Sequence, residues 1–253
     1  MTAVLNGELQ AHFGRTGRAR IHASGSLELR GPLAARKLYY LRNVTAGIFG
    51  GDANSTAIHC GPVAGARIES PSATKVYSMP AGAAHTTVKL CAEPGSRLVW
   101  GPHATILHTG SALHQDTRVT LHEGARVFIA ETLVMGRIAA GQRFDFSAYE
   151  SSLVVEDGCG RTRYREAYRL EPGPDLEAAM GGLAALTTVY ALGVRAGDEA
   201  LDGLFQDRPL AGWSRLPNDC GVVVKALTTT LSQGAALARG GLAVLEALHP
   251  AVV

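Results

Sequence analysis

The sequence predicts a mainly β protein whose sheets are stacked in layers, in the manner of a β-helix, with a few short helices toward the C-terminus. The first observation is a repeat of about 30 residues, in which a glycine and a small residue open an arginine-led segment of strand length. The second is a short strand after each copy, giving the pairs 65–70 with 73–77, 95–100 with 104–108, and 124–129 with 132–135. The third is the content of 30 glycines and 11 prolines, which suits a chain with many turns.

Length and charge narrow the possible classes of protein. A chain of 253 residues can bury a substantial core, and we expect a single domain over residues 1–253. Within it we expect a β body to about residue 227 and a C-terminal helix over about 230–248. The net charge of +2 lacks the basic excess of a nucleic-acid-binding protein. No apolar run reaches the roughly 18 residues of a membrane span.

The N-terminus and the cysteines bear on the cellular compartment. Met1–Glu8 has neither the basic start nor the long apolar stretch of a secretory signal. The four cysteines lie far apart, and none belongs to a C-x-x-C pair: Cys60, Cys91, Cys159 and Cys220. We therefore expect a cytoplasmic protein with reduced thiols. A role for one of them as a soft metal ligand is the less favoured alternative, because a buried cysteine usually behaves as a small hydrophobe.

Before the repeat, alternation of apolar and polar residues predicts a hairpin of strands over 7–13 and 18–23. A turn at 31–33 then leads into a strand over 37–41. The next segment contains the adjacent glycines Gly50 and Gly51, which permit a sharp backbone bend before Asp52. The bend could bring Asp52 inward, although the favoured interpretation is that Asp52 closes a turn by bonding its own backbone.

The third copy of the repeat continues into a segment with an acid, an arginine and glycines at close spacing: Glu131, Gly136, Arg137 and Gly141. Two interpretations are open for the acid. Glu131 forms an ion pair with Arg137 that holds a corner, or it binds a ligand, since a buried charge needs a partner in either case. Strands over 151–156 and 161–170 then flank a glycine-containing tip and predict a second hairpin.

The C-terminal part is predicted to be mixed. Residues 175–192 begin on helical spacing, but two adjacent glycines and a β-branched second half indicate a change to a strand. An acidic start predicts a short helix over 198–206. Strands over 213–216 and 222–227 surround a turn at 217–219, and apolar residues on helical spacing predict an amphipathic helix over 231–248.

The common catalytic and metal-binding motifs are absent from the sequence. It contains no G-x-S-x-G, no G-x-x-x-x-G-K-[ST] and no H-E-x-x-H. Among the nine histidines, His108 and His114 have the even spacing that places two side chains on one face of a strand, but a turn is expected between them. We therefore expect no enzymatic activity and no fixed, tight metal site, with most histidines facing solvent.

An ordered set of motifs resembles the urease accessory protein UreD family, called UreH in some organisms. Its elements are Gly31-Pro32-Leu33, the segment 47–52 with Gly50, Gly51 and Asp52, the segment 73–77 with Lys75 and Tyr77, Glu131 with Gly136, Arg137 and Gly141, and the late segments 214–217 and 222–225. The resemblance spans nearly the whole chain. Three positions depart from the family pattern: Gln142 stands where a glutamate is usual, and Pro71 and His103 stand where glutamine is common.

The resemblance implies a non-catalytic scaffold with a nearly all-β fold. Proteins of this family bind UreF, which recruits the GTPase UreG, and the assembly docks on apo-urease and delivers nickel. The resemblance thus implies UreF-type and UreG-type proteins and apo-urease as partners, with neither nucleic acid nor a membrane. It also implies an internal passage that Ni²⁺ occupies transiently, and no tightly bound cofactor.

A passage has to bind the ion weakly, which oxygen ligands do better than clustered histidine and cysteine. We expect its lining to include Asp52, Ser70, Ser72, Thr74, Glu131 and Glu166. The first alternative is a purely structural adaptor between urease and UreF without metal contact. The second is an enzyme with an unrecognised site, which the missing pair of nucleophile and base makes the weakest of the three hypotheses.

Overall fold

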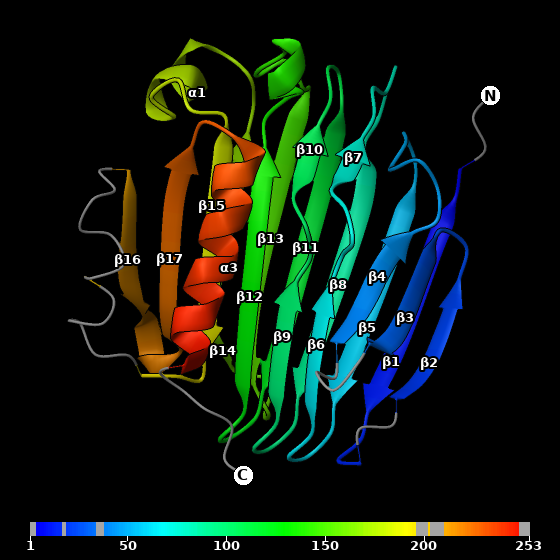
Figure 1. The fold of residues 1–253 in the computed structure, drawn as a ribbon, viewed down its shortest axis with the longest axis vertical. Coiled ribbons are helices and arrows are strands. Elements are labelled where there is room, and N and C mark those ends of the chain that lie inside the picture. The colour runs from blue at the N-terminus through cyan, green and yellow to red at the C-terminus, as the bar shows by residue number, and fades with distance from the viewer. Residues whose placement is uncertain (1–3, 17–18, 34–37, 196–201, 203–209, 248–253) are drawn as a thin grey trace.

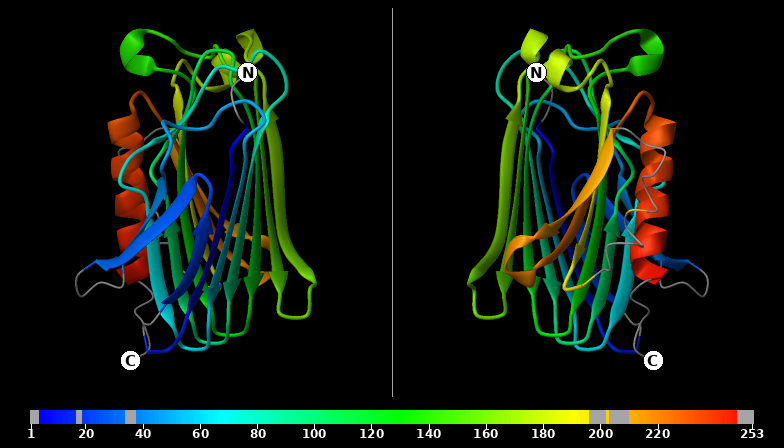
Figure 2. Two further views of the ribbon diagram at one scale, coloured as in Figure 1. Left: turned by 90° about the vertical axis from the view of Figure 1, so that its right-hand side faces the viewer. Right: turned by 90° about the vertical axis from the view of Figure 1, so that its left-hand side faces the viewer.

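The computed structural model describes residues 4–16, 19–33, 38–195, 202 and 210–247. These residues form two β-sheets that face each other, with one long helix on the outer surface of the second sheet (Figure 1). Seen from the side, the sheets are two layers whose strands run along the long axis of the molecule (Figure 2). The predicted layered, mainly β architecture is therefore confirmed.

Sheet A is the layer farther from the long helix. Its strands, in spatial order, are β14 (Thr162–Leu170), β13 (Ala148–Asp157), β11 (Ala112–Leu121), β8 (Ala84–Ala92), β5 (Ala53–Cys60), β1 (Asn6–Phe13) and β2 (Ala19–Ser24). The five strands from β13 to β1 are mutually parallel, whereas β14 and β2 add antiparallel edges. Residues at matching positions of the parallel strands therefore lie side by side.

Sheet B carries the helix. Its strands, in spatial order, are β16 (Ala211–Leu216), β17 (Gly221–Thr228), β15 (Ala185–Leu192), β12 (Arg126–Val134), β9 (Arg97–Gly101), β6 (Gly65–Glu69), β4 (Leu38–Asn43) and β3 (Leu27–Leu33). Two short strands lie off this path, with β10 (Thr105–Leu107) beside β12 and β7 (Thr74–Val76) beside β10.

The three sequence repeats are the three central strands of sheet B. Strands β6, β9 and β12 pair in parallel, and Gly65 and Arg126 both lie opposite Arg97. The short strands after the first two copies are β7 and β10, as predicted. The separate strand predicted over 132–135 is wrong, because β12 continues without a break from Arg126 to Val134 and pairs along its whole length after Arg126 with β15.

Most of the remaining elements agree with the predicted ones. The hairpin β1–β2, the hairpin β13–β14 and the strands β16 and β17 are confirmed. Residues 31–33 belong to β3 after a shift in register, so the predicted turn there is wrong. The helix predicted over 198–206 falls outside the described residues except for Asp202.

Both α-helices and short 3-10 turns accompany the sheets. Helix α1 (Pro174–Ala179) ends before the two adjacent glycines at 181 and 182, and single 3-10 turns cover η2 (Ile138–Ala140) and η3 (Pro217–Asp219). Helix α3 (Leu231–Ala247) lies on the outer face of β12, β15 and β17, where its Leu242 and Leu245 join a buried apolar cluster. No helix in the described part of the chain is long and apolar enough to span a membrane.

The repeated arginines help to hold this helix. Arg67 of β6 and Arg97 of β9 both donate to the carboxylate of Glu246 near the end of α3, the second at 3.2 Å. The Arg97 guanidinium also lies 4.8 Å from the ring centre of Phe128. The arginines of the first two copies thus share one carboxylate of the helix.

The core between the sheets is divided into two apolar clusters. The larger one contains Leu9, Ile58, Leu90 and Trp100, and the smaller one, nearer the β7 and β10 end, contains Leu107, Leu113 and Met135. All four cysteines lie in the described part, and none forms a disulfide, in agreement with the prediction. The zone where the two clusters meet is polar.

Candidate functional site

A row of polar side chains crosses the inner face of sheet A. The parallel register aligns Asn54 of β5, Thr86 of β8, Gln115 of β11 and Ser151 of β13, and the antiparallel pairing adds Tyr168 of β14. Alternation along each strand directs all five to the same side as the buried apolar residues that flank them. Stacking therefore converts one position per strand into a continuous polar row.

The facing sheet supplies a shorter row opposite the first. Glu131 of β12 pairs with Thr188 of β15, and Thr188 pairs with Lys225 of β17. The two rows meet directly, because the Gln115 Nε2 group donates to Glu131 Oε1 at 2.9 Å. Buried polar groups are costly unless they are bonded, so this layer is a specific feature of the interior.

Cavities converge on Glu131 from two sides. A cavity of about 770 Å³ extends from the β3–β4 edge to Gln115 and Glu131. Beyond them lie two small voids of about 40 and about 10 Å³, which also touch Glu131 and lead past Tyr168 and Thr188. A water molecule needs at least about 10–15 Å³, so the larger void has room for a few waters and the smaller for one at most. Glu131 therefore marks the point where a wide cavity narrows.

The environment of Glu131 makes its charge easy to lose. Burial between the sheets raises its pKa to about 7, and the negative charge of Glu166 acts in the same direction. The hydrogen bond from Gln115 partly opposes these effects. Near neutral pH the side chain therefore exchanges readily between a neutral acid and a carboxylate, and an arriving cation would favour the carboxylate.

Glu166 lies at the far end of the layer in a different setting. It accepts hydrogen bonds from Tyr164 at 2.5 Å and Tyr190 at 3.1 Å, and it forms an ion pair with Lys225. Burial alone would raise its pKa, but the bonds from Lys225 and Tyr164 outweigh burial and lower it. The interior thus holds one carboxylate poised near neutrality and a second that stays ionised.

The donors along the wide cavity are mainly oxygen atoms. The hydroxyl of Thr86 is buried without a hydrogen-bond partner and lines the same cavity as Gln115 and Glu131. His103 contributes an imidazole, whose Nδ1 accepts the backbone N–H of Ala104 at 2.8 Å. Hydroxyl, amide and carboxylate oxygens bind a borderline cation such as Ni²⁺ less tightly than a set of imidazoles and thiolates would.

The structure brings together most of the oxygen-bearing residues selected from the sequence. Ser70, Ser72 and Thr74 line the wide cavity that reaches Glu131, and Glu166 lines the void on its other side. Asp52 is not among the lining residues of these cavities. Its carboxylate accepts the backbone N–H groups of Phe49 at 2.9 Å and Leu5 at 3.0 Å, which is the turn-closing arrangement.

The motif residues around this bend have structural contacts. Gly51 has a φ of +84°, and Gly50 lies close to the Met79 side chain. Lys75 is exposed on β7, next to the wide cavity. The Tyr77 ring stacks on Phe49 at 4.8 Å, and its hydroxyl donates to a backbone carbonyl at 3.3 Å. These residues shape the loop beside the cavity mouth.

The predicted ion pair between Glu131 and Arg137 does not form. Arg137 is exposed and donates from Nε to Gln142 Oε1 at 2.6 Å, whereas Glu131 points between the sheets, because the chain turns outward at Gly136. Gly136 has a φ of +132°, and a Cβ there would come within 2.3 Å of a backbone oxygen. Gly141, with a φ of +74°, ends η2.

Several residues of the polar layer were not identified from the sequence. They are Asn54, Thr86, Gln115, Tyr168, Thr188, Tyr190 and Lys225. One signal was present, since Thr86 and Gln115 are polar at positions that alternate with buried apolar residues. That signal identifies a polar inward position, but only the register shows that the positions join into one row.

Comparisons with known proteins identify the family of this chain. The family model described as "UreD urease accessory protein" matches residues 2–252. A protein named urease accessory protein UreD from Haloarcula marismortui is 32% identical over 214 residues, covering 81% of this chain and 71% of its own length. One of the same name from Brucella suis is 33% identical over 203 residues, covering 76% and 71%. The chain belongs to the UreD family of urease accessory proteins.

Proposed function

We propose that this chain assists the maturation of urease by holding UreF-type and UreG-type accessory proteins on apo-urease and by passing Ni²⁺ through its interior. It acts as a scaffold and not as an enzyme, in the cytoplasm. The observation that carries the nickel route is the convergence of the cavities on Glu131, within a layer of oxygen donors. Homology to proteins named for urease accessory function supports the assignment to urease.

The chemistry of this layer suits transfer better than storage. An ion entering the wide cavity first meets hydroxyl and amide oxygens, which bind it weakly. At Glu131 the ion displaces a proton from a group whose pKa is about 7, so binding is weak and reversible near neutral pH. The ionised Glu166 then lies on the next void along the layer. No position on this route is a cage of soft ligands that would retain the ion.

The decisive test replaces Glu131 with glutamine, which keeps its shape but removes its charge. The chain is co-expressed with urease and the other accessory proteins, and the nickel bound per urease is measured. We expect Glu131→Gln to lower nickel loading about tenfold or more. The matched control is Glu8→Gln, an exposed carboxylate on the outer face of β1. Nickel loading equal to that of the wild type would rule out the route through Glu131.

The alternative function is a structural adaptor that never contacts the metal. Bulky substitutions in the cavity wall, such as Thr74→Leu or Ser72→Phe, separate the two functions, because both residues line the wide cavity. A conduit loses nickel delivery while it still captures a UreF-type protein in a pull-down. An adaptor retains both activities. Far-UV circular dichroism of each variant checks that the fold survives.

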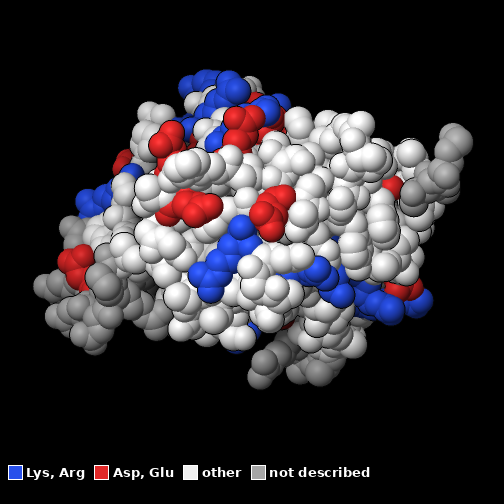
Figure 3. Space-filling model, turned by 90° about the horizontal axis from the view of Figure 1, so that it is seen from above, with Lys and Arg blue, Asp and Glu red and all other residues white. Residues whose placement is uncertain are grey.

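Partner docking has a suitable surface at the upper end of the molecule. Viewed from above, this end has a broad area with few charged side chains on the side of the N-terminus (Figure 3). Val4, which precedes β1, and Val44, which follows β4, are 60% and 52% exposed. We expect Val44→Asp to weaken capture of the UreF-type protein, whereas Val63→Asp, on an exposed loop at the opposite end, leaves it unchanged. Equal effects of both variants would exclude docking at this end.

A further inference from the structure

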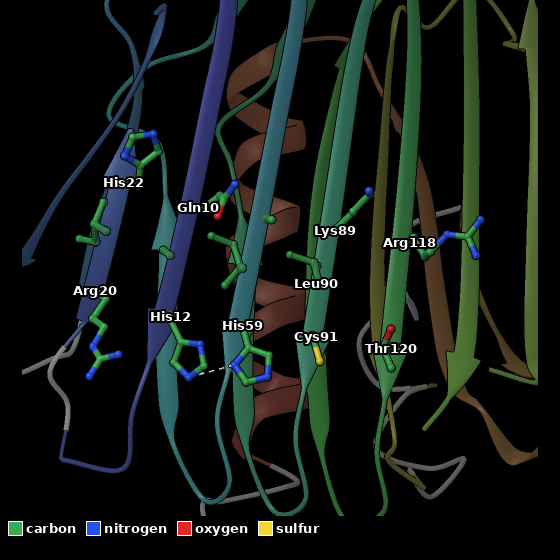
Figure 4. Close-up of a pocket in the computed structure, with 14 residues that line it drawn as sticks. Gln10, His12, Arg20, His22, His59, Lys89, Leu90, Cys91, Arg118 and Thr120 are labelled. Carbon is green, nitrogen blue, oxygen red and sulfur yellow. Dashed lines mark hydrogen bonds between the residues drawn. The ribbon is translucent and has the colours of Figure 1, made fainter. Parts of the chain in front are cut away.

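The outer face of sheet A carries a second group of chemically active side chains, far from the interior layer. His12 of β1, His59 of β5 and Cys91 of β8 are register partners in three adjacent parallel strands (Figure 4). Neighbouring strands in a sheet are about 4.7–4.9 Å apart, so these three side chains lie in one row. They line a surface pocket of about 530 Å³.

A second row follows just past the strand ends. Glu93 lies two residues after Cys91, and His122 two residues after Thr120, the residue that is in register with Cys91. Glu93 Oε1 is 3.1 Å from His59 Nε2, 3.9 Å from His122 Nε2 and 4.0 Å from Cys91 Sγ. On the other side of His59, its Nδ1 is 3.2 Å from His12 Nε2. Glu93 thus lies among three possible metal ligands.

The spacing of these atoms fits a single metal ion. One ligand atom from each of His59, Cys91 and Glu93 lies within 4.8 Å of the others. Ligands bound at about 2.0–2.3 Å from one tetrahedral ion are roughly 3.3–3.8 Å apart, so small side-chain rotations close the site. All three side chains are partly exposed and therefore free to make such rotations. The pocket above gives an ion access from solvent.

We propose that His59, Cys91 and Glu93 form a surface site for a divalent transition-metal ion, with His122 as a further ligand, while His12 contacts the opposite ring nitrogen of His59. Imidazole, thiolate and carboxylate together favour borderline ions such as Zn²⁺ and Ni²⁺ over Mg²⁺ or Ca²⁺. Binding releases the thiol proton of Cys91, since the thiolate is the ligand. This site differs from the interior layer in position and donor type, and the proposal does not depend on the proposed function.

Neighbouring residues agree with a metal ligand role for His122. A Cβ at Gly158 would lie 2.6 Å from His122 Nδ1, so the glycine leaves the space that the imidazole occupies. The cations that also line the pocket are Arg20, Lys89 and Arg118. Figure 4 shows Lys89 and Arg118 extending away from the His12–His59 pair, while Arg20 lies on the strand beside His12. Glu93 and the thiolate supply the negative charge that offsets a divalent ion.

The test uses the purified full-length chain and Co²⁺, a spectroscopic substitute for Zn²⁺ and Ni²⁺. We expect one Co²⁺ per chain with a near-ultraviolet thiolate-to-cobalt charge-transfer band. Cys91→Ser removes that band, and His59→Ala weakens binding about tenfold or more. Competition by Zn²⁺ and Ni²⁺ then ranks the natural ions. Glu93→Gln provides a second ligand variant, and thermal melting verifies that each variant folds.

Two matched controls are available on the same chain. Cys159→Ser removes an exposed cysteine at the tip of the β13–β14 hairpin, and His22→Ala removes a histidine of the same pocket that lies apart from His59 (Figure 4). Both controls should bind Co²⁺ like the wild type. The proposal is overturned by a wild type without the thiolate band, by a band that persists in Cys91→Ser, or by a His59→Ala variant with unchanged affinity.

Discussion

The two faces of sheet A are built by the same parallel register but carry opposite chemistry. Inside, Asn54, Thr86 and Gln115 present oxygen and amide groups to an enclosed cavity. Outside, His12, His59 and Cys91 present nitrogen and sulfur to solvent. The inner row suits weak and reversible contact with a cation, whereas the outer row suits tight binding. In a stacked sheet, a single position repeated in neighbouring strands is therefore enough to create a site.

The largest expected effect is a difference in the free energy of unfolding between substitutions on the inner and outer faces of sheet A. Leu90 and Lys89 are neighbours on β8, but Leu90 is 1% exposed in the larger apolar cluster, and Lys89 is exposed on the outer face. We expect Leu90→Ala to lower the free energy of unfolding by about 2–5 kcal/mol. Lys89→Ala should change it by less than about 0.5 kcal/mol. Urea denaturation of both variants measures the difference, and similar losses would contradict the assignment of faces.

The second expected effect is a pH dependence of the free energy of unfolding that the buried carboxyl group of Glu131 causes. Burial raises the pKa of Glu131 to about 7 in the folded state, above its value of 4.5 in the unfolded chain. The contribution of Glu131 to the free energy of unfolding is therefore fully present below pH 4.5. It falls by on the order of 3 kcal/mol as the pH rises from 4.5 through 7. Because glutamine does not titrate, Glu131→Gln should be more stable than the wild type at pH 8 and equal to it near pH 4.

The check is a series of denaturation curves for both proteins between pH 4 and pH 8. The control is Glu8→Gln, whose carboxylate is exposed. This control should follow the wild type at every pH. A constant difference between Glu131→Gln and the wild type over the whole range would show that the pKa of Glu131 is the same in the folded and unfolded states, and would contradict the raised pKa.

The third effect compares ion pairs on the two faces. Lys225 supports the carboxylate of Glu166 at the end of the interior layer, and their side chains are 42% and 18% exposed. We expect Lys225→Met to lower the free energy of unfolding by about 1 kcal/mol at pH 7, a value reduced by solvent screening. The pKa of Glu166 is lowered in the fold, so this stabilisation is present above the unfolded pKa and declines as the pH falls through the folded pKa.

The matched control for this pair lies on the outer face. Arg118 donates to Glu156 at 2.5 Å, and its side chain is 54% exposed. Arg118→Met should change stability by less than about 0.5 kcal/mol at any pH. A larger loss from Arg118→Met than from Lys225→Met in chemical denaturation would reverse the comparison between the faces.

The smallest expected effect is a difference in stability between alanine substitutions on the exposed and buried faces of helix α3. A Cβ at Gly240 would meet nothing within 4 Å, whereas one at Gly234 would approach Thr187 Oγ1 to 2.8 Å. We expect Gly240→Ala to raise the free energy of unfolding by about 0.5–1 kcal/mol, since alanine favours a helix over glycine. Gly234→Ala should lower it, because the helix would have to move away from sheet B. Thermal melting of both variants tests the sign of each change.

The sequence predicted elements better than contacts. The repeat at Gly65, Gly95 and Gly124 identified the layered architecture, because each copy carries its own turn and its own alternating strand. The continuous strand β12 was missed, since local pattern does not reveal that β15 pairs along its whole length. Likewise Arg137 near Glu131 suggested an ion pair, but the chain turns outward at Gly136 and separates them.

The residues of the two candidate sites were harder to predict from the sequence than the strands were. Each histidine viewed alone along the chain offered no metal motif, because His12, His59 and Cys91 are more than 30 residues apart from one to the next. The polar layer was hidden in a similar way, apart from Glu131 and Glu166, since only the strand register shows that the inward polar positions of Thr86 and Gln115 join into one row. Asp52, in contrast, was predicted from the sequence to line the passage, but its carboxylate accepts hydrogen bonds from two backbone N–H groups.

By itself, the sequence determined the fold class, the positions of most strands and the family, because turn residues, alternation and ordered motifs are local properties of the chain. Only the tertiary structure decided which side chains share a site. Parallel pairing places residues about 30 positions apart within one strand spacing of each other. That pairing depends on the register of whole strands, which many weak contacts determine together, and no local pattern specifies it.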